Sequence, residues 1–209
     1  MKFYRCKEKL SDMFKRGALS AFVLIGVICV RQMFAAGMEE PELLNRAHNL
    51  MGQKNYSDAL TCYTDVIKLN PKNMMAYYGR ALAYQRLGQT QKAFDDYNEA
   101  ITLNPGWGYA YEGRGHIYEK IGQYSQALDD FNKAISLDPK SKLAWFGRAL
   151  VCTKQRQFEK ALNDLNQAIS LDPKFALAFS LRAVINKKLG HLDLARQDSE
   201  KAKALDYTK

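Results

Sequence analysis

Side chains that commonly bind metals or act as nucleophiles are few in this sequence and widely separated. The histidines are His48, His116 and His191, and the cysteines are Cys6, Cys29, Cys62 and Cys152. None of them has the short spacing of a zinc site, and no nucleophile–base pair is recognisable around them. We therefore predict no enzymatic activity, no metal site and no cofactor.

One glycine-rich stretch, residues 106–115, invites comparison with nucleotide-binding loops. Its glycines are Gly106, Gly108, Gly113 and Gly115. The third glycine of a dinucleotide fingerprint would fall at Tyr111, no strand is expected before the stretch, and no Lys-Ser/Thr pair follows it. We interpret these glycines as helix-crossing positions and a turn, and we predict no small-molecule substrate.

A more regular pattern relates basic and acidic side chains. Arginines recur at one constant spacing, at Arg46, Arg80, Arg114, Arg148 and Arg182. Aspartates with the same spacing follow the last four of them, at Asp96, Asp130, Asp164 and Asp198. Both columns could simply be solvated. We instead predict four structural ion pairs, because the arginines are flanked by Tyr, Ala and Gly.

These columns belong to a repeat that runs through most of the chain. A proline follows Leu-Asn or Leu-Asp once in every unit, at Pro71, Pro105, Pro139 and Pro173. Apolar residues lie at helical spacing on both sides of a turn glycine, which is Gly88, Gly122 or Gly190, and the proline ends the second helix. Each unit is thus predicted to be a helical pair, which must stack on its neighbours to bury its apolar face.

The pattern resembles the tetratricopeptide repeat, a 34-residue helix–turn–helix with small, aromatic and proline columns of this kind. The resemblance implies an all-α fold, a right-handed superhelical solenoid of five hairpins over residues 40–209. The expected units are 40–73, 74–107, 108–141, 142–175 and 176–209. The first unit departs at Lys54, where the turn glycine is expected, and the fifth at Ser199, in the aromatic column. The polar second helix of the fifth unit suits a terminal cap, so we expect the solenoid to end there.

The resemblance further implies that the first helices line a concave groove that binds proteins or peptides. Chaperone-binding members hold a terminal carboxylate there with Lys, Asn and Arg. The matching positions lack those donors: they are Leu44, His48, Gly79, Tyr109 and Gly113.

The groove-facing columns are instead mostly apolar or aromatic. The predicted groove residues are Met75, Tyr78, Leu82, Tyr109, Glu112, His116, Leu143, Phe146 and Leu150. Apolar side chains exposed on one curved face usually mark a binding site, and aromatic anchors are enriched at interfaces. The alternative is that some of them pack beneath the superhelix. We predict a protein or peptide partner with an apolar or aromatic segment.

The net charge of +9 is unevenly distributed along the chain. Residues 1–37 contain seven Lys or Arg and two acidic residues, whereas the remainder contains 24 basic and 20 acidic residues. Most of the excess therefore lies where basic residues set membrane topology. Because both signs are interspersed in the repeats, we predict no nucleic-acid partner.

Residues 1–37 have the character of a signal peptide or a membrane anchor. A basic stretch precedes thirteen uncharged residues, 18–30. As a helix these would span roughly 20 Å, less than the ~30 Å hydrocarbon core of a bilayer. Small residues at 35–37 suit cleavage, while extension through residues 33–36 would give a retained anchor. Either reading predicts an exported or membrane-anchored protein with extracytoplasmic repeats, periplasmic or secreted in a bacterium.

Together these features predict a non-catalytic scaffold that binds a protein or peptide at or across a membrane. The alternative is a structural tether that self-associates and presents the repeats at a membrane. Size-exclusion chromatography with light scattering separates the two, because a uniform oligomer without ligand favours the tether.

We predict that the leader inserts in a membrane and leaves the repeats on the far side, because its positive charges precede the apolar run. Protease added to intact cells, or to spheroplasts where there is an outer membrane, should digest the repeats. The mass of the mature protein distinguishes cleavage from anchoring. Full protection in intact cells, with digestion after lysis, would contradict this topology.

Overall fold

The computed structural model describes residues 39–206, which form ten helices. In chain order they are α3 (Glu40–Gly52), α4 (Tyr56–Leu69), α5 (Met74–Arg86), α6 (Thr90–Leu103), α7 (Gly108–Lys120), α8 (Tyr124–Leu137), α9 (Lys142–Lys154), α10 (Phe158–Leu171), α11 (Ala176–Lys188) and α12 (Leu192–Asp206). The predicted leader lies outside the described residues. Within residues 39–206, no helix has both the length and the apolar character needed to cross a membrane.

The turn inside each hairpin contains one residue in the left-handed conformation, at the position where the repeat pattern predicts a turn glycine. The turn glycines Gly88, Gly122 and Gly190 have φ of 75°, 80° and 82°, which confirms their predicted left-handed conformation. In the first and fourth hairpins, Lys54 and Arg156 adopt the same conformation, with φ of 60° and 59°. This conformation costs a residue with a side chain about 1 kcal/mol.

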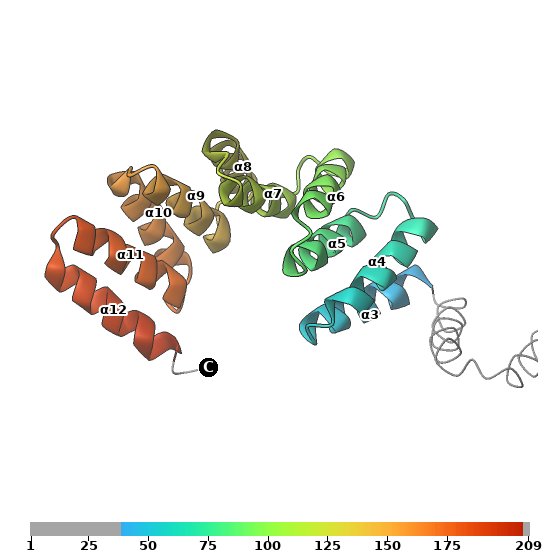
Figure 1. The fold of residues 1–209 in the computed structure, drawn as a ribbon, viewed down its shortest axis with the longest axis horizontal. Helices are drawn as coiled ribbons and strands as arrows, with labels where there is room; N and C mark the ends of the chain where they lie inside the picture. Colours follow the sequence, from blue (N-terminus) through green and yellow to red (C-terminus); the bar gives the residue numbers. More distant parts are fainter. Residues whose placement is uncertain (1–38, 207–209) are drawn as a thin grey trace, which may run out of the picture.

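Consecutive helices pair into five hairpins that stack along an arc from α3 to α12 (Figure 1). Each second helix also packs on the first helix of the following hairpin. First helices of neighbouring hairpins contact each other in the pairs α3–α5, α7–α9 and α9–α11, whereas no two described second helices contact each other as extensively. The first helices therefore form the inner layer of the arc. The predicted all-α solenoid of five hairpins is confirmed.

At three junctions between hairpins, an aromatic ring packs on a glycine of the next first helix. The ring–glycine pairs are Tyr63 with Gly79, Tyr97 with Gly113, and Phe131 with Gly147. A Cβ atom at any of these glycines would lie only 2.3–2.4 Å from the ring, so only glycine fits. At the last junction Leu165 takes the place of the ring and Leu181 that of the glycine, and the two pack in one cluster.

The last four arginines of the predicted column connect second helices of neighbouring hairpins. Arg114 donates from Nε and Nη2 to both carboxylate oxygens of Asp130 in its own hairpin, at 2.8 and 2.7 Å. Its Nη1 donates to Oδ1 of Asn98 in the preceding hairpin, at 2.7 Å. The rings of Tyr111 and Tyr118 lie 5.6 and 5.8 Å from its guanidinium carbon, within reach of a cation–π interaction.

The same arrangement recurs along the chain. The other bidentate pairs are Arg80–Asp96, Arg148–Asp164 and Arg182–Asp198, and the bonds to the preceding hairpin reach Thr64, Asn132 and Asn166. The aspartate side chains are 6–8% exposed and those of the arginines 18–25%, so these are largely buried ion pairs rather than surface ones. The regular spacing of the asparagines is a signal that the sequence-based predictions do not use.

Gly113→Ala should lower the free energy of unfolding by about 2 kcal/mol. The added methyl group overlaps the Tyr97 ring, and the gain in helix propensity, about 1 kcal/mol, does not offset the overpacking. Urea denaturation followed by circular dichroism measures the change. Gly52→Ala is the matched control, because a Cβ atom there meets nothing within 4 Å. Equal stability of the two variants would show that the ring contact is not limiting.

A double-mutant cycle on Arg114 and Asp130 should give a coupling free energy of about 2 kcal/mol. Each single alanine substitution should cost about 3 kcal/mol, because it leaves a largely buried charge without its partner. The surface pair Lys68–Asp65, at 2.8 Å, is the control and should couple by less than about 1 kcal/mol. Zero coupling between Arg114 and Asp130 would refute a stabilising role for the pair.

Candidate binding face of the first helices

His48, His116 and the two described cysteines are packing groups, whereas His191 is exposed next to the turn glycine Gly190. His116 lies edge-on to Phe131, with ring centroids 5.0 Å apart, and His48 lies 5.9 Å from Tyr63. Burial disfavours the charged imidazolium and lowers the pKa of His116. Cys62 and Cys152 are buried thiols, and residues 39–206 contain no His, Cys, Asp and Glu cluster able to hold a metal ion.

Three of the predicted groove residues form an exposed apolar column on the inner layer. Met75, Tyr109 and Leu143 are 44%, 47% and 42% exposed, and each is the second residue of its first helix. Leu177 continues the column on α11 and is 62% exposed. It stands one repeat length after Leu143, so the periodicity could have identified it. We call these four residues the exposed apolar column.

The other predicted groove residues pack between hairpins, contrary to the expectation of one exposed surface. Tyr78 contacts Trp107 with ring centroids 4.8 Å apart, and Phe146 contacts Phe175 at 5.1 Å. Each partner lies immediately before the next first helix in the chain. One helical turn after Tyr78, Glu112 and Phe146, the same helix faces carry three half-buried residues. They are Leu82, His116 and Leu150. The alternative of packing beneath the superhelix therefore describes these positions better.

Glu112 departs most from the expectation. It occupies the same column as Tyr78 and Phe146, but its side chain is buried, and its Oε2 accepts a hydrogen bond from the Ser141 hydroxyl at 2.7 Å. Burial disfavours the ionised carboxylate and raises the pKa of Glu112. Burial, and next the charge of Glu112, also raise the pKa of Tyr78 to about 12. The buried carboxylate of Glu112 thus disfavours the ionised form of Tyr78.

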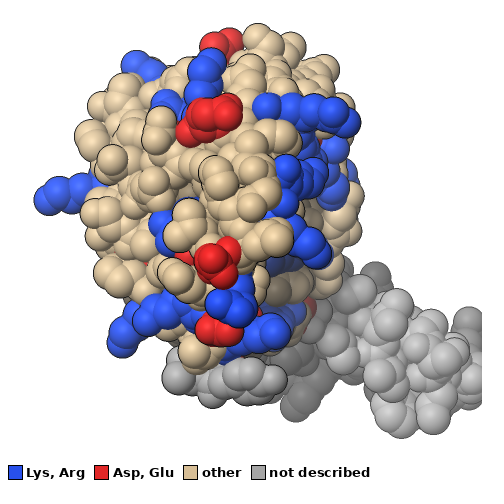
Figure 2. All heavy atoms as spheres, turned by 90° about the vertical axis from the view of Figure 1, so that its left-hand side faces the viewer, with Lys and Arg blue, Asp and Glu red and all other residues tan. Residues whose placement is uncertain are grey.

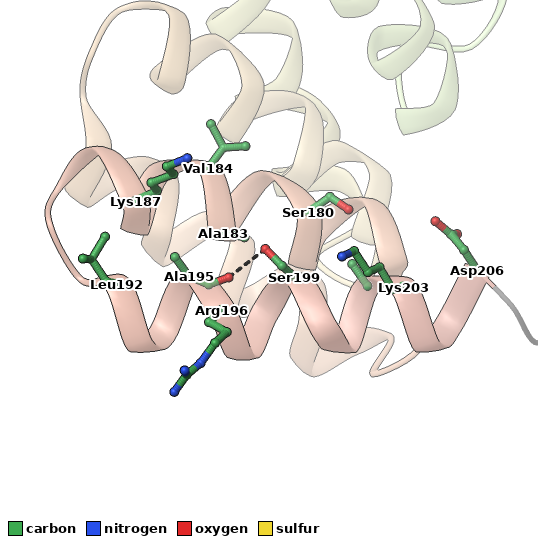
Figure 3. A pocket seen from close by; sticks show the side chains of 11 residues that line it. Ser180, Ala183, Val184, Lys187, Leu192, Ala195, Arg196, Ser199, Lys203 and Asp206 are labelled. Carbon is green, nitrogen blue, oxygen red and sulfur yellow. Dashed lines mark hydrogen bonds between the residues drawn. The ribbon is translucent and has the colours of Figure 1, made fainter.

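A hollow of about 550 Å³ lies between α11 and α12, and Figure 3 shows the side chains around it. Its lining includes Ser180, Ala183, Val184, Lys187, Arg196, Ser199 and Lys203. The equivalent residues of the preceding hairpin, among them Phe146, Leu162, Leu165 and Ile169, are apolar and pack in one cluster with α11. Serine and basic residues replace these apolar residues on the end face, while Val184 and Leu192 remain exposed beside the hollow. Figure 2 views this end of the arc, where basic and acidic side chains are interspersed over an otherwise uncharged surface.

Comparison with known proteins identifies the repeat. Family profiles described as tetratricopeptide repeat match residues 44–106, and again residues 108–141 and 143–175. Human small glutamine-rich tetratricopeptide repeat-containing protein beta is 38% identical over 55 residues, which are 26% of this chain and 18% of that protein. Rat sperm-associated antigen 1 is 39% identical over 62 residues, 30% of this chain and 6% of that protein. The chain therefore matches less than a fifth of the length of either relative.

Solved structures share the fold at low sequence identity. PilW, described as a type IV pilus biogenesis factor, has a TM-score of 0.74 and 24% identity, covering 80% of this chain and 78% of PilW. MamA from Desulfovibrio magneticus has a TM-score of 0.68 and 20% identity, covering 83% and 98% of the two chains. YrrB, described as having an unusual peptide-binding site, has a TM-score of 0.60 and 22% identity, covering 80% and 86%.

Proposed function

The chain belongs to the tetratricopeptide repeat family, and from this premise we propose that it is a non-catalytic scaffold whose binding surface is the inner layer of first helices. Its partner is a protein or peptide with an apolar or aromatic segment. Among solved structures of the same fold, one is described by its peptide-binding site and another by its role in pilus biogenesis, and both descriptions are compatible with a scaffold role.

The exposed apolar column is the observation that carries this proposal. It presents one apolar side chain at the same position of four successive first helices, all on the inner layer. Exposed apolar groups gathered on one face of a soluble fold usually mark an interface. Helices packed side by side are about 10 Å apart, and a peptide in the polyproline II conformation advances about 3.1 Å per residue and returns to the same face every three residues. A partner segment with apolar residues about three positions apart would therefore match the column.

We further propose that the scaffold acts at or across a membrane through residues 1–37. The support is the order of charges in that segment, where basic residues precede an uncharged run. This part of the proposal rests on the sequence alone.

Replacing Met75, Tyr109 and Leu143 together by serine should reduce partner capture at least about tenfold, since each loses an exposed apolar contact worth about 1 kcal/mol or more. The readout is quantitative mass spectrometry after affinity capture with the chain as bait. Thermal unfolding should shift little, because the side chains are exposed.

The matched control replaces Leu69, Leu171 and Leu194, which are exposed on second helices, by serine. It should capture the partner as the unchanged chain does. Equal capture by both folded variants would place the binding surface elsewhere. A uniform oligomer in light scattering that dissociates only in the first variant would favour the self-associating tether.

A further inference from the structure

Glu112 stands out among the buried carboxylates of residues 39–206. The others are Asp96, Asp130, Asp164 and Asp198, and each forms a bidentate pair with an arginine. Glu112 is only 7% exposed and forms no ion pair with a basic side chain of the described residues. Buried charges are normally paired, so an unpaired carboxylate requires an explanation.

One oxygen of this carboxylate remains available. Oε2 accepts the hydrogen bond from Ser141, while Oε1 has no hydrogen-bond partner among the described side chains. No buried side-chain oxygen of residues 39–206 lacks a partner, so Oε1 must reach the molecular surface. Oε1 is therefore not fully enclosed by the protein.

Three aromatic rings contact one another near the start of α7, the helix that carries Glu112. Trp107 packs on Tyr78 at 4.8 Å and on Tyr109 at 6.0 Å between ring centroids. Tyr109 and Glu112 are separated by almost one turn on α7 and so share one face of that helix. Among these groups Tyr109 is the most exposed, as part of the exposed apolar column.

The equivalent interface two hairpins later shows what is missing. There Phe146 packs on Phe175, and Nζ of Lys142 lies 5.2 Å from the centroid of the Phe175 ring while pairing with Asp172. The residues two repeat lengths earlier are neutral: Met74 stands in place of Lys142 and Asn104 in place of Asp172. The aromatic pair Tyr78–Trp107 therefore lacks the internal cation that its counterpart has.

We propose that Tyr78, Trp107, Tyr109 and Glu112 form a binding site for one cationic side chain, lysine or arginine, of the partner segment. Aromatic faces attract cations through their quadrupole, and the attraction grows as water is excluded. A cation bound beside Glu112 would favour its ionised form, which supplies an opposite charge and an acceptor oxygen. The site rests on the proposed function, because it places a basic residue of the partner beside the apolar residue that contacts Tyr109.

The test uses the whole chain in detergent, with 5-fluorotryptophan in place of tryptophan. The probes are n-butylammonium and n-propylguanidinium, with n-butanol as the uncharged control, at constant ionic strength. Fluorine NMR reports Trp107 separately from Trp145, and Trp145→Phe assigns the signals. Both cations should shift the Trp107 signal in a saturable way, and n-butanol should not.

Two variants make the test specific. Glu112→Gln keeps an acceptor for Ser141 but removes the charge, and should weaken cation binding at least about tenfold. Met74→Lys should supply an internal cation, as Lys142 does, and abolish binding of the probes. Glu99→Gln, a change of equal charge away from the site on α6, should leave binding unchanged.

The absence of a saturable shift, an equal response to n-butanol, or full cation binding by folded Glu112→Gln would overturn the cation site. The titration does not involve the partner. If it fails while capture still depends on Met75, Tyr109 and Leu143, the cation site alone is wrong and the scaffold function stands.

Discussion

The close approach of neighbouring hairpins is the constraint on which the rest of the structure depends, and at three of the four junctions between described hairpins an aromatic ring seated on a glycine allows it. With the Tyr97 ring against the backbone at Gly113, α6 and α7 approach more closely than side chains would allow. This approach brings Arg114 within reach of Asn98 on the preceding hairpin and Asp130 on its own. A tight apolar contact thus lies beside a charged one, and the charged contact is kept at the last junction, where Leu165 and Leu181 replace the ring and the glycine.

Because the hairpins stack regularly, equivalent positions recur along the inner layer. The side chains at these positions differ from hairpin to hairpin, and these differences determine whether each part of the layer is apolar, aromatic or polar. The second residue of each first helix is exposed in all four later hairpins. The residue almost one turn later always meets the start of the next first helix, so its character depends on that partner. Trp107 makes one of these junctions aromatic, and Ser141 makes the next one polar.

The repeat period suffices to predict ten helices, their turns at residues such as Gly122, and the alignment of arginines with aspartates, because all of these depend on residues within one unit. The partners of Arg114 and Glu112 in other units are harder to predict. Asn98 lies on the second helix of the preceding hairpin, and Ser141 lies just before the first helix of the following one. Glu112 is likewise buried by contacts between hairpins, and the helical spacing inside one unit cannot predict these contacts.

The exchange of ring and glycine for two leucines at the last junction makes the fourth and fifth hairpins specific for each other. If the fourth hairpin preceded one with a glycine, Leu165 would leave a void; if the third preceded the fifth, Phe131 would collide with Leu181. Only hairpins joined by ring–glycine contacts can be duplicated or lost without a change in the residues that meet at this contact. The array can therefore change length within its first four hairpins, while the fifth must keep the fourth as its neighbour.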